Sequence, residues 1–378
     1  MNILLTSGRT PAPLELARHL KALGNKVFLI ESSRIHLCTL SRVFTKKIRV
    51  PAPAECPQKY IAAVKKIISE NNIELVIPMY EEILYLAQFK SEFEADCFRL
   101  IPDLEVLERF HNKFTFIEML KELNVKCPET VQVSNAQDAA DAVEQMEKSI
   151  IKPVYSRFGT FVKYNPNKAV LNKLDITEKN PWVVQEQISG RQFGTYILAL
   201  NGDVLAMSLY AQEVTYNNVS INLSHSENPE ILDWIRTLIK KSAFTGQMSF
   251  DLIVNDQGIF PIEANPRVTS GIHLLVQDPN FIQQLTAPVK REILPSGKNS
   301  CAAKQLLLPT TLAFWNKGLF KWKCLLKDRD IIFQKNDPLP FLFGFYLYLL
   351  YLIFLCLIKM KNSQIVSSMD IDWDGGKK

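Results

Sequence analysis

The chain has 378 residues, of which 47% are hydrophobic and 22% are charged, so its composition is that of a folded protein with two or three subdomains and excludes a largely disordered chain. Lysine and arginine exceed aspartate and glutamate by 44 − 39 = 5, which suits a phosphorylated ligand or an anionic lipid surface but does not indicate nucleic acid. The seven cysteines are scattered without a C-x-x-C pair, which argues against a disulfide framework or a zinc site and favours a reducing compartment.

Residues 1–105 alternate between strand-like and helical patterns. Residues 3–5 form an apolar run, residues 14–23 have helical spacing that ends at Gly24, and residues 27–30 are strand-like again. Further segments of these two kinds follow at 60–69, 75–77, 81–89 and 100–101. Such alternation predicts a parallel sheet covered by helices, hence an α/β domain over residues 1–105. Met1 leads into the first strand without the features of a signal peptide, which predicts a cytoplasmic protein.

Residues 106–290 have a different pattern and are expected to form a second domain. A helical stretch over residues 104–123 leads to Pro128, where the proline marks a junction. The expected elements after Pro128 are a helix at 136–146, strand-like runs at 150–164, 182–187 and 195–210, a helix at 231–241, and strands at 247–254 and 258–263. The part from about 128 to about 200 is expected to be a small α+β lobe.

Residues 291–378 are expected to be a C-terminal extension. Within it, residues 341–358 carry no charged side chain and are followed by Lys359 and Lys361. This segment is at the lower edge of the length that spans a bilayer, and it also suits an interfacial segment or a helix buried against the protein. The aromatic residues and the adjoining lysines favour lipid, which would put the protein at the inner face of a membrane. The acidic residues 370–376 are expected to be a surface extension or a short strand.

The most specific motif is Glu263-Ala264-Asn265-Pro266-Arg267, at the end of an apolar strand. Asp251 lies on the preceding strand, so the two strands can present Asp251, Glu263 and Asn265 on one face. Oxygen ligands of this kind bind Mg²⁺, and Mn²⁺ is an alternative ion for the same site. Arg267 is then placed to stabilise charge on a transferred phosphoryl group. The competing interpretation is a hairpin with ordinary solvated charges.

This order of motifs resembles the ATP-grasp superfamily, in particular the carbamoyl-phosphate synthase large subunit and the carboxylate–amine ligases. The resemblance covers about residues 1–280. It implies a parallel-sheet α/β pre-ATP-grasp domain, followed by a two-lobed α+β ATP-grasp fold that holds ATP between two sheets. It also implies that Lys113 and Lys152 contact the phosphates of ATP. Lys152 interrupts an apolar strand, where a charge is costly without an anionic partner.

The resemblance assigns further nucleotide contacts. Gln185, Glu186 and Ile188 match the hinge that reads adenine. Gln192 matches a position where relatives often have a glutamate that binds ribose, so this chain keeps the hydrogen bonds but not the charge. The loop Ser156-Arg157-Phe158-Gly159-Thr160 resembles the loop that covers the phosphates, with one glycine where relatives often have several. Arg157 is expected to compensate for that difference.

Two loops are candidates for the acceptor site. The turn Thr6-Ser7-Gly8-Arg9 lacks G-x-G-x-x-G, which argues against NAD, and Arg9 is instead a speculative substrate ligand. Thr269-Ser270-Gly271 follows Arg267 and is expected beside the γ-phosphate of ATP. His273 is expected to be structural.

The resemblance therefore implies an ATP-dependent ligase that activates a carboxylate as an acyl phosphate and joins it to an amine or similar nucleophile. Its partners would be small carboxylate and nucleophile substrates, not nucleic acid, with membrane association through residues 341–358 if that segment meets lipid. One alternative is an ATP-binding regulatory or scaffold protein at a membrane that has lost turnover. Another is a kinase-like phosphoryl transfer without ligation.

Overall fold

The computed structural model describes residues 1–157, 159, 161–211, 215–216, 219–220, 222–296, 300–302, 304, 327–344, 346 and 368–376. The N-terminal domain is built on a parallel sheet with strand order β3-β2-β1-β4. Its elements are β1 (Asn2–Thr6), α1 (Pro11–Ala22), β2 (Lys26–Glu31), η1 (Leu37–Leu40), β3 (Lys46–Arg49), α2 (Pro57–Asn71), β4 (Leu75–Ile77), α3 (Glu82–Gln88) and η2 (Lys90–Glu92). The predicted parallel α/β domain is thus confirmed, and the expected strand at 100–101 is absent.

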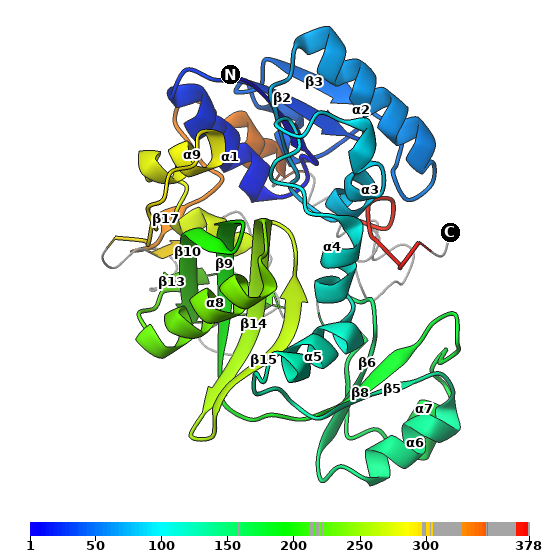
Figure 1. Ribbon diagram of the computed structural model, residues 1–378. Coiled ribbons are helices and arrows are strands. Elements are labelled where there is room, and N and C mark those ends of the chain that lie inside the picture. Colours follow the sequence, from blue (N-terminus) through cyan, green and yellow to red (C-terminus); the bar gives the residue numbers. More distant parts are fainter. Residues whose placement is uncertain are drawn as a thin grey trace.

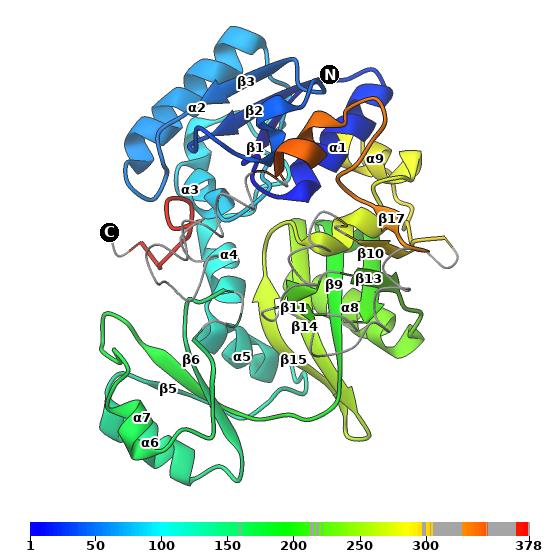
Figure 2. The same cartoon turned by 180° about the vertical axis from the view of Figure 1, so that it is seen from behind.

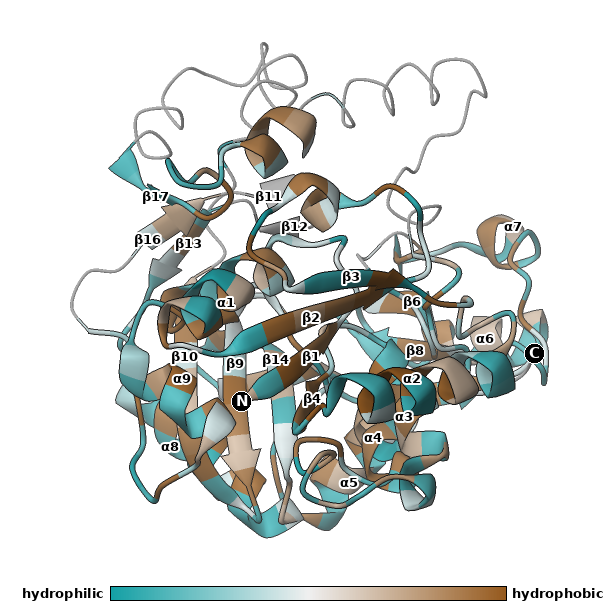
Figure 3. Ribbon diagram, turned by 90° about the horizontal axis from the view of Figure 1, so that it is seen from above, coloured by the Kyte–Doolittle hydropathy of each residue, from teal (hydrophilic) through white to brown (hydrophobic). Residues whose placement is uncertain are grey.

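The N-terminal sheet is apolar on both faces because each face is covered. Leu14 and Leu20 of α1 pack with Ile3 and Leu5 on one face, and this cluster continues into the second domain. On the other face, residues of α2 and α3 pack against Leu4 and neighbouring side chains. Figure 3 shows the strands of this sheet coloured mainly as hydrophobic between α1 and α2. Buried parallel strands have this near-continuous apolar character.

Two helices connect the N-terminal domain to the small lobe (Figure 1). The sequence predicts one helical stretch here, but the structure has α4 (Leu104–His111) and α5 (Lys113–Glu122). The break is at Asn112, whose side chain accepts hydrogen bonds from the backbone N–H groups of Phe114 and Thr115. Asparagine is a favoured N-cap, so it starts a new helix and sets the direction in which Lys113 leaves the backbone.

The small lobe is a four-stranded sheet of order β5-β8-β6-β7 with two helices against it. Its elements are β5 (Thr130–Val133), α6 (Ala136–Glu144), β6 (Ser149–Pro153), β7 (Lys163–Tyr164), α7 (Lys168–Leu171) and β8 (Trp182–Glu186). The sheet ends at Glu186, short of the boundary near residue 200 that the sequence suggests. The next strand, β9 (Arg191–Leu200), pairs instead with β10 (Asp203–Ala211) and β14 (Gly246–Asn255) of the large sheet.

The large lobe is a seven-stranded sheet of order β15-β14-β9-β10-β13-β16-β17. Its other elements are β13 (Asn222–His225), α8 (Pro229–Ser242), β15 (Gly258–Asn265), η3 (Ser270–Leu274), α9 (Pro279–Thr286), β16 (Ser300–Ala302) and β17 (Arg329–Asp330), with a separate pair β11 (Thr215–Tyr216) and β12 (Val219–Ser220). Asn201 and Gly202 turn β9 into β10 with φ values of 51° and 82°. Left-handed conformations at both positions are typical of a two-residue hairpin, for which Asn-Gly is a preferred sequence.

The C-terminal region packs against the N-terminal domain and extends the large sheet. Strands β16 and β17 extend the large sheet, and Arg18 of α1 donates to the Asp337 carboxylate at 3.0 Å. Residues 368–376 lie beside α3 and α4 in both Figure 1 and Figure 2. Trp373 is 2% exposed and packs into the N-terminal core. The prediction that residues 370–376 form a surface extension or a short strand is therefore wrong, because Ile371 and Trp373 provide apolar anchors that the core covers.

Most of the apolar segment 341–358 lies outside the described residues, which include only 341–344 and 346 of it. Within the described part of the chain, no helix has both the length and the apolar character needed to cross a bilayer.

Candidate active site

The β14–β15 hairpin gathers the oxygen ligands that the sequence predicts. Asp251 pairs directly with Glu263, and Ser249 pairs with Asn265. Cross-strand partners share a face and residues two apart on a strand point the same way, so Asp251, Glu263 and Asn265 lie on one face of the sheet. The alternate residues Phe250 and Ala264 belong to the hydrophobic cluster on the other face.

Lys152 reaches this hairpin from the small lobe. It lies on β6 and its Nζ donates to Oε1 of Gln185 at 3.0 Å and to the carbonyl oxygen of Ile262 at 3.1 Å. The β14–β15 register shifts just after Asp251, so Ile262 has no ladder partner and its carbonyl can accept from Lys152. Burial lowers the pKa of Lys152 to about 8, although the charges of Glu263 and Asp251 oppose the shift.

Lys113 approaches the same carboxylate from α5. Its Nζ donates to the carbonyl oxygen of Ser156 at 2.9 Å and lies 3.7 Å from Oε2 of Glu263. Burial also lowers the pKa of Lys113, and the Glu263 charge opposes this. Two buried lysines therefore flank one carboxylate between the two sheets, and an additional anion there would relieve their desolvation.

The residues predicted to read the nucleoside lie along the connection between the lobes. Gln185 is buried, and its amide donates to Oγ1 of Thr130 at 2.9 Å while its oxygen accepts from Lys152. Glu186 is exposed and Ile188 is half-buried. Gln192 is exposed near the start of β9. The Gln185 side chain is thus buried and hydrogen-bonded within the protein, whereas Glu186 is exposed at this hinge.

A buried carboxylate that the sequence analysis missed organises the other side of the site. Glu81 is fully buried and accepts hydrogen bonds from Arg157, with Nε at 2.6 Å from Oε1, and from the backbone N–H of Trp373 at 3.0 Å. Nε of Arg267 lies 3.5 Å from Glu81 Oε1, and its guanidinium stacks over the Tyr80 ring at 4.7 Å. We call Glu81, Arg157 and Arg267, with His111 and Asp372 beside them, the Glu81 cluster.

The charges of the Glu81 cluster are strongly coupled. Burial would raise the pKa of Glu81, but the charge and hydrogen bonds of Arg157, together with the charge of Arg267, hold it well below its usual range. Burial lowers the pKa of His111 to about 3, so this imidazole is neutral. Its Nε2 and the Nε of Arg267 are buried and have no hydrogen-bond partner within the described residues. Arg267 also donates to Oδ1 of Asn265 at 3.1 Å, which ties the cluster to the β14–β15 hairpin.

Arg157 comes from the predicted phosphate-covering loop, of which positions 158 and 160 lie outside the described residues. Its guanidinium also donates to the carbonyl oxygen of Trp373 and lies 3.3 Å from Oδ1 of Asp372. Gly159, in the same loop, has a left-handed φ of 60°. The loop arginine is therefore held by the N-terminal domain and the C-terminal segment together.

The residues considered for the acceptor site have separate surroundings. Arg9 pairs with Glu31 at 2.8 Å and with Asp370 at 2.5 Å. The Thr269 hydroxyl donates to the carbonyl oxygen of Thr195 at 3.3 Å. His273 is buried, with Nδ1 at 2.5 Å from Oε2 of Glu15, which fits the structural role that the sequence predicts.

Glu81 could have been found from its position in the chain. It follows β4 after Pro78-Met79-Tyr80, at the carboxyl end of a parallel strand. The strand order reverses next to β1, because β1 is followed by β2 on one side, whereas β4, which the chain reaches from β3 through α2, lies on the other side. Such a switch point is where α/β sheets bind ligands. The Thr6–Arg9 turn and Glu81 both lie there.

Comparison with known proteins identifies the domain. A family model described as an ATP-grasp domain matches residues 110–271. A tyramine–L-glutamate ligase of Methanocaldococcus jannaschii is 25% identical over 142 residues, which cover 35% of this chain and 46% of that protein. The carbamoyl phosphate synthase large chain of Clostridium acetobutylicum is 21% identical over 231 residues, which cover 57% of this chain and 22% of that protein. The matches thus span less than half the length of these curated relatives.

The fold is shared with solved structures. N5-carboxyaminoimidazole synthetase from Staphylococcus aureus, complexed with ADP, superimposes with a TM-score of 0.66 at 14% identity, covering 83% of this chain and 86% of that one. The resemblance read from the sequence is therefore confirmed at the level of fold and superfamily. Residues 110–271 therefore match an ATP-grasp domain, as the sequence resemblance predicts.

Proposed function

We propose that the chain is an ATP-dependent ligase that activates a carboxylate as an acyl phosphate and joins it to an amine or a similar nucleophile. The observation that carries the proposal is the meeting of Lys113, Lys152 and Glu263 between the two sheets. Two desolvated lysines beside carboxylates suit a phosphate chain and its metal better than they suit a structural core. The ATP-grasp match over residues 110–271 and the similarity to a tyramine–L-glutamate ligase support the reaction class.

In this proposal each sequence-predicted residue keeps its role. Lys113 and Lys152 neutralise phosphate charge, and Arg157 and Gly159 cover the phosphates from the loop. Glu186 and the backbone near Gln185 and Ile188 read adenine, and Gln192 binds ribose. Residues 1–105, 106–290 and 291–378 remain the proposed domains, although the C-terminal part contributes β16 and β17 to the large sheet.

Asp251, Glu263 and Asn265 are proposed to hold Mg²⁺, or Mn²⁺. They fit a hard cation because two carboxylates and an amide oxygen share one face of the hairpin, and Mg²⁺ usually takes one or two carboxylates with phosphate oxygens and water completing its shell. The described residues contain no group of three or more His, Cys, Asp or Glu side chains suited to a metal, so the nucleotide would have to supply the other ligands. When bound, the cation contributes charge neutralisation on the phosphates.

The chemistry needs positioning more than acid–base catalysis. A carboxylate oxygen of the substrate attacks the γ-phosphorus, the bond from that phosphorus to the bridging oxygen breaks, and ADP leaves. The amine then attacks the acyl carbon, inorganic phosphate departs with the C–O electron pair, and the amine proton passes to solvent or phosphate. Arg267 is proposed to stabilise the charge on the transferred phosphoryl group, because its guanidinium also donates to Oδ1 of Asn265 and so lies beside the proposed metal ligands.

An ADP-release screen tests the proposal. Purified full-length protein would be incubated with ATP, Mg²⁺ and pools of carboxylates, with and without pools of amines, and ADP and inorganic phosphate would be measured together. We expect both products in equal amounts, dependent on a carboxylate and an amine, and absent in Lys152→Ala. ADP without free phosphate would indicate a kinase instead. Saturable ATP binding with no product from any pool would favour the regulatory alternative.

A further inference from the structure

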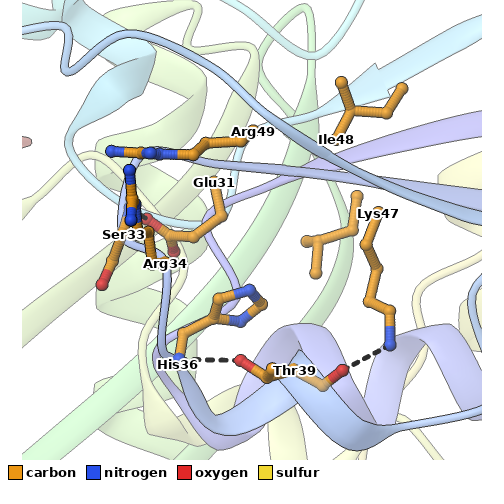
Figure 4. A pocket seen from close by; sticks show the side chains of 9 residues that line it. Glu31, Ser33, Arg34, His36, Thr39, Lys47, Ile48 and Arg49 are labelled. Atoms are coloured by element: carbon orange, nitrogen blue, oxygen red, sulfur yellow. Dashed lines mark hydrogen bonds between the residues drawn. The ribbon is translucent and has the colours of Figure 1, made fainter.

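A pocket of about 320 Å³ lies in the N-terminal domain (Figure 4). Every residue that lines it is between Leu29 and Arg49, so it shares no residue with the candidate active site between the lobes. Its volume is at the lower end of the range for small-molecule sites, about 300 to 1,000 Å³, and suits a compact organic ligand.

The pocket is formed where the parallel strands β2 and β3 end. Leu29 pairs with Lys47 and Glu31 pairs with Arg49, so these four side chains share one face of the sheet. The chain that leaves β2 turns back over this face and contributes Arg34, as well as His36 and Thr39. The carboxyl ends of parallel strands are the usual place for ligands in α/β sheets.

The pocket has an excess of positive charge. Residues 32–50 contain five lysines and arginines and no aspartate or glutamate. Arg34, Lys47 and Arg49 all line the pocket, and Figure 4 shows Arg34 and Arg49 at one end of it with Lys47 at the other. Their side chains have no carboxylate within ion-pair distance among the described residues. Three cations without a carboxylate partner around one concavity create a positive potential that attracts an anion.

The neighbouring acids are already engaged. Glu31, the one acid in the pocket wall, accepts from Arg9 at 2.8 Å and from the backbone N–H groups of Gly8 and Ser33 at 2.8 and 3.0 Å. Asp337, whose charge also acts on Lys47, is bonded to Arg18 at 3.0 Å. Neither carboxylate is therefore available to neutralise the pocket cations.

The cations retain free donors. Arg49 uses only Nε, which donates to the carbonyl oxygen of Ser32 at 3.3 Å, and Arg34 makes no hydrogen bond within the described residues. Lys47 donates to the carbonyl oxygens of Thr39 and Ser41 at 2.5 and 2.8 Å, which leaves its third proton free. Guanidinium groups pair with phosphate through two parallel hydrogen bonds, and an ammonium adds a point charge.

We propose that this pocket binds a small phosphomonoester, with its phosphate at Arg34 and Arg49 and with its organic part, whose hydroxyl groups can accept from Lys47, extending towards the other end. A dinucleotide does not fit. Glu31 already accepts from Arg9 and from the backbone N–H groups of Gly8 and Ser33, which disfavours its use as a ribose ligand. The His36 ring also packs so closely on the first turn that a Cβ added at Gly8 would lie 2.6 Å from its Nδ1, leaving no room for a pyrophosphate at that turn.

Calorimetric titration of the full-length protein tests the proposal, with ribose 5-phosphate as the phosphomonoester, ribose as the neutral control, and inorganic phosphate to separate the phosphate group from the sugar. We expect saturable binding of ribose 5-phosphate, weaker binding of phosphate and none of ribose. Arg34→Ala and Arg49→Ala should each weaken the binding of ribose 5-phosphate by about tenfold or more. Both side chains are exposed, so these variants should fold normally.

Lys46→Ala is the matched control for Lys47→Ala. The two lysines are neighbours on β3, but Lys46 pairs with Phe28 and points to the opposite face. We expect Lys47→Ala to weaken binding and Lys46→Ala to leave it unchanged. Equal losses would mean diffuse surface attraction and would overturn the proposal, as would no saturable binding at millimolar ligand. Loss of binding in Lys152→Ala would assign the ligand to the nucleotide cleft instead, whereas failure of the ligase screen leaves this test unaffected.

Discussion

The side chains around Glu263 and the Glu81 cluster are two regions of the candidate active site that differ in how far apart their residues lie in the sequence. The oxygen and lysine side chains around Glu263 come from strands and a helix start whose local sequence already marks them. The Glu81 cluster joins side chains that no local pattern connects: Arg157 and Glu81 are 76 positions apart, and Trp373 and Glu81 are 292 apart. Motifs on one hairpin can be read from sequence, whereas a charge cluster assembled by five separate segments needs the fold.

The two regions also differ in how their charges are balanced. Around Glu263, two lysines with lowered pKa values face carboxylates that are only partly buried. In the Glu81 cluster, one fully buried carboxylate serves two arginines and a backbone N–H. The first arrangement is left open for a ligand. The second is largely closed within the protein and holds Arg157 and Arg267 in place, so variants of the two regions should fail in different ways.

The largest expected effect is on stability, from Glu81→Ala. Removing this carboxylate leaves Arg157 and Arg267 buried without their partner, so we expect a loss of about 3 to 5 kcal/mol in the free energy of unfolding. Urea denaturation measures it. Glu92→Ala is the control, because Glu92 forms an exposed ion pair with Lys65 in the same domain and should cost less than about 1 kcal/mol. Similar small losses for both variants would refute the organising role of Glu81.

The N-terminal fold was more predictable than the Glu81 cluster, because its pattern is local in the sequence. The alternation of apolar runs and helical spacing in residues 1–105 depends on neighbours in sequence, and it correctly predicted the parallel sheet. The lobe boundary was less predictable, because β9 has the same alternating pattern whichever sheet it joins. The acidic C-terminal segment was misread, since its charges suggest solvent while Trp373 and two arginines hold it inside.

The next largest effect is on turnover, from Glu263→Gln. If Glu263 holds the cation, its loss should reduce ADP release by about 100-fold or more, because metal charge contributes several kcal/mol to the transition state. Stability should change little, since the Glu263 side chain is 24% exposed. Asp256→Asn, at the exposed turn of the same hairpin, is the matched control. Near-normal turnover at ordinary Mg²⁺ in Glu263→Gln would remove the metal assignment.

A smaller effect concerns Lys152 and pH. Its pKa of about 8 in the free protein means that binding an anion requires proton uptake above that pH. We therefore expect ATP affinity to fall by up to about tenfold per pH unit above about pH 8, and to stay flat below it. Lys152→Arg keeps its charge and should remove this decline. Lys152→Ala should weaken ATP binding more than Lys113→Ala, and equal negligible effects would exclude both lysines.

The smallest expected effect is on stability, from Asp372→Asn. This variant distinguishes the role of Asp372 from that of Glu81, the other carboxylate that faces Arg157. Burial and the Glu81 charge together raise the pKa of Asp372 to about 7, against the opposing effect of Arg157. Its Oδ1 is also buried without a hydrogen-bond partner within the described residues. Glu81 therefore keeps the negative charge, and Asp372 is partly protonated near neutral pH. Replacing it with the neutral amide should change the free energy of unfolding by no more than about 1 kcal/mol at pH 7.

The sign of the pH dependence sharpens this test. Because the folded protein holds the Asp372 proton more tightly than the unfolded chain, whose pKa is near 3.8, the wild-type protein loses stability from this group as pH rises from about 4 to about 7. The asparagine variant lacks that loss, so it should gain relative to wild type between about pH 5 and about pH 8. Urea denaturation of the wild-type protein and the variant at about pH 5 and about pH 8 measures the difference in the free energy of unfolding. A variant that instead loses several kcal/mol at pH 8 would mean that Asp372, like Glu81, is a charged partner of Arg157.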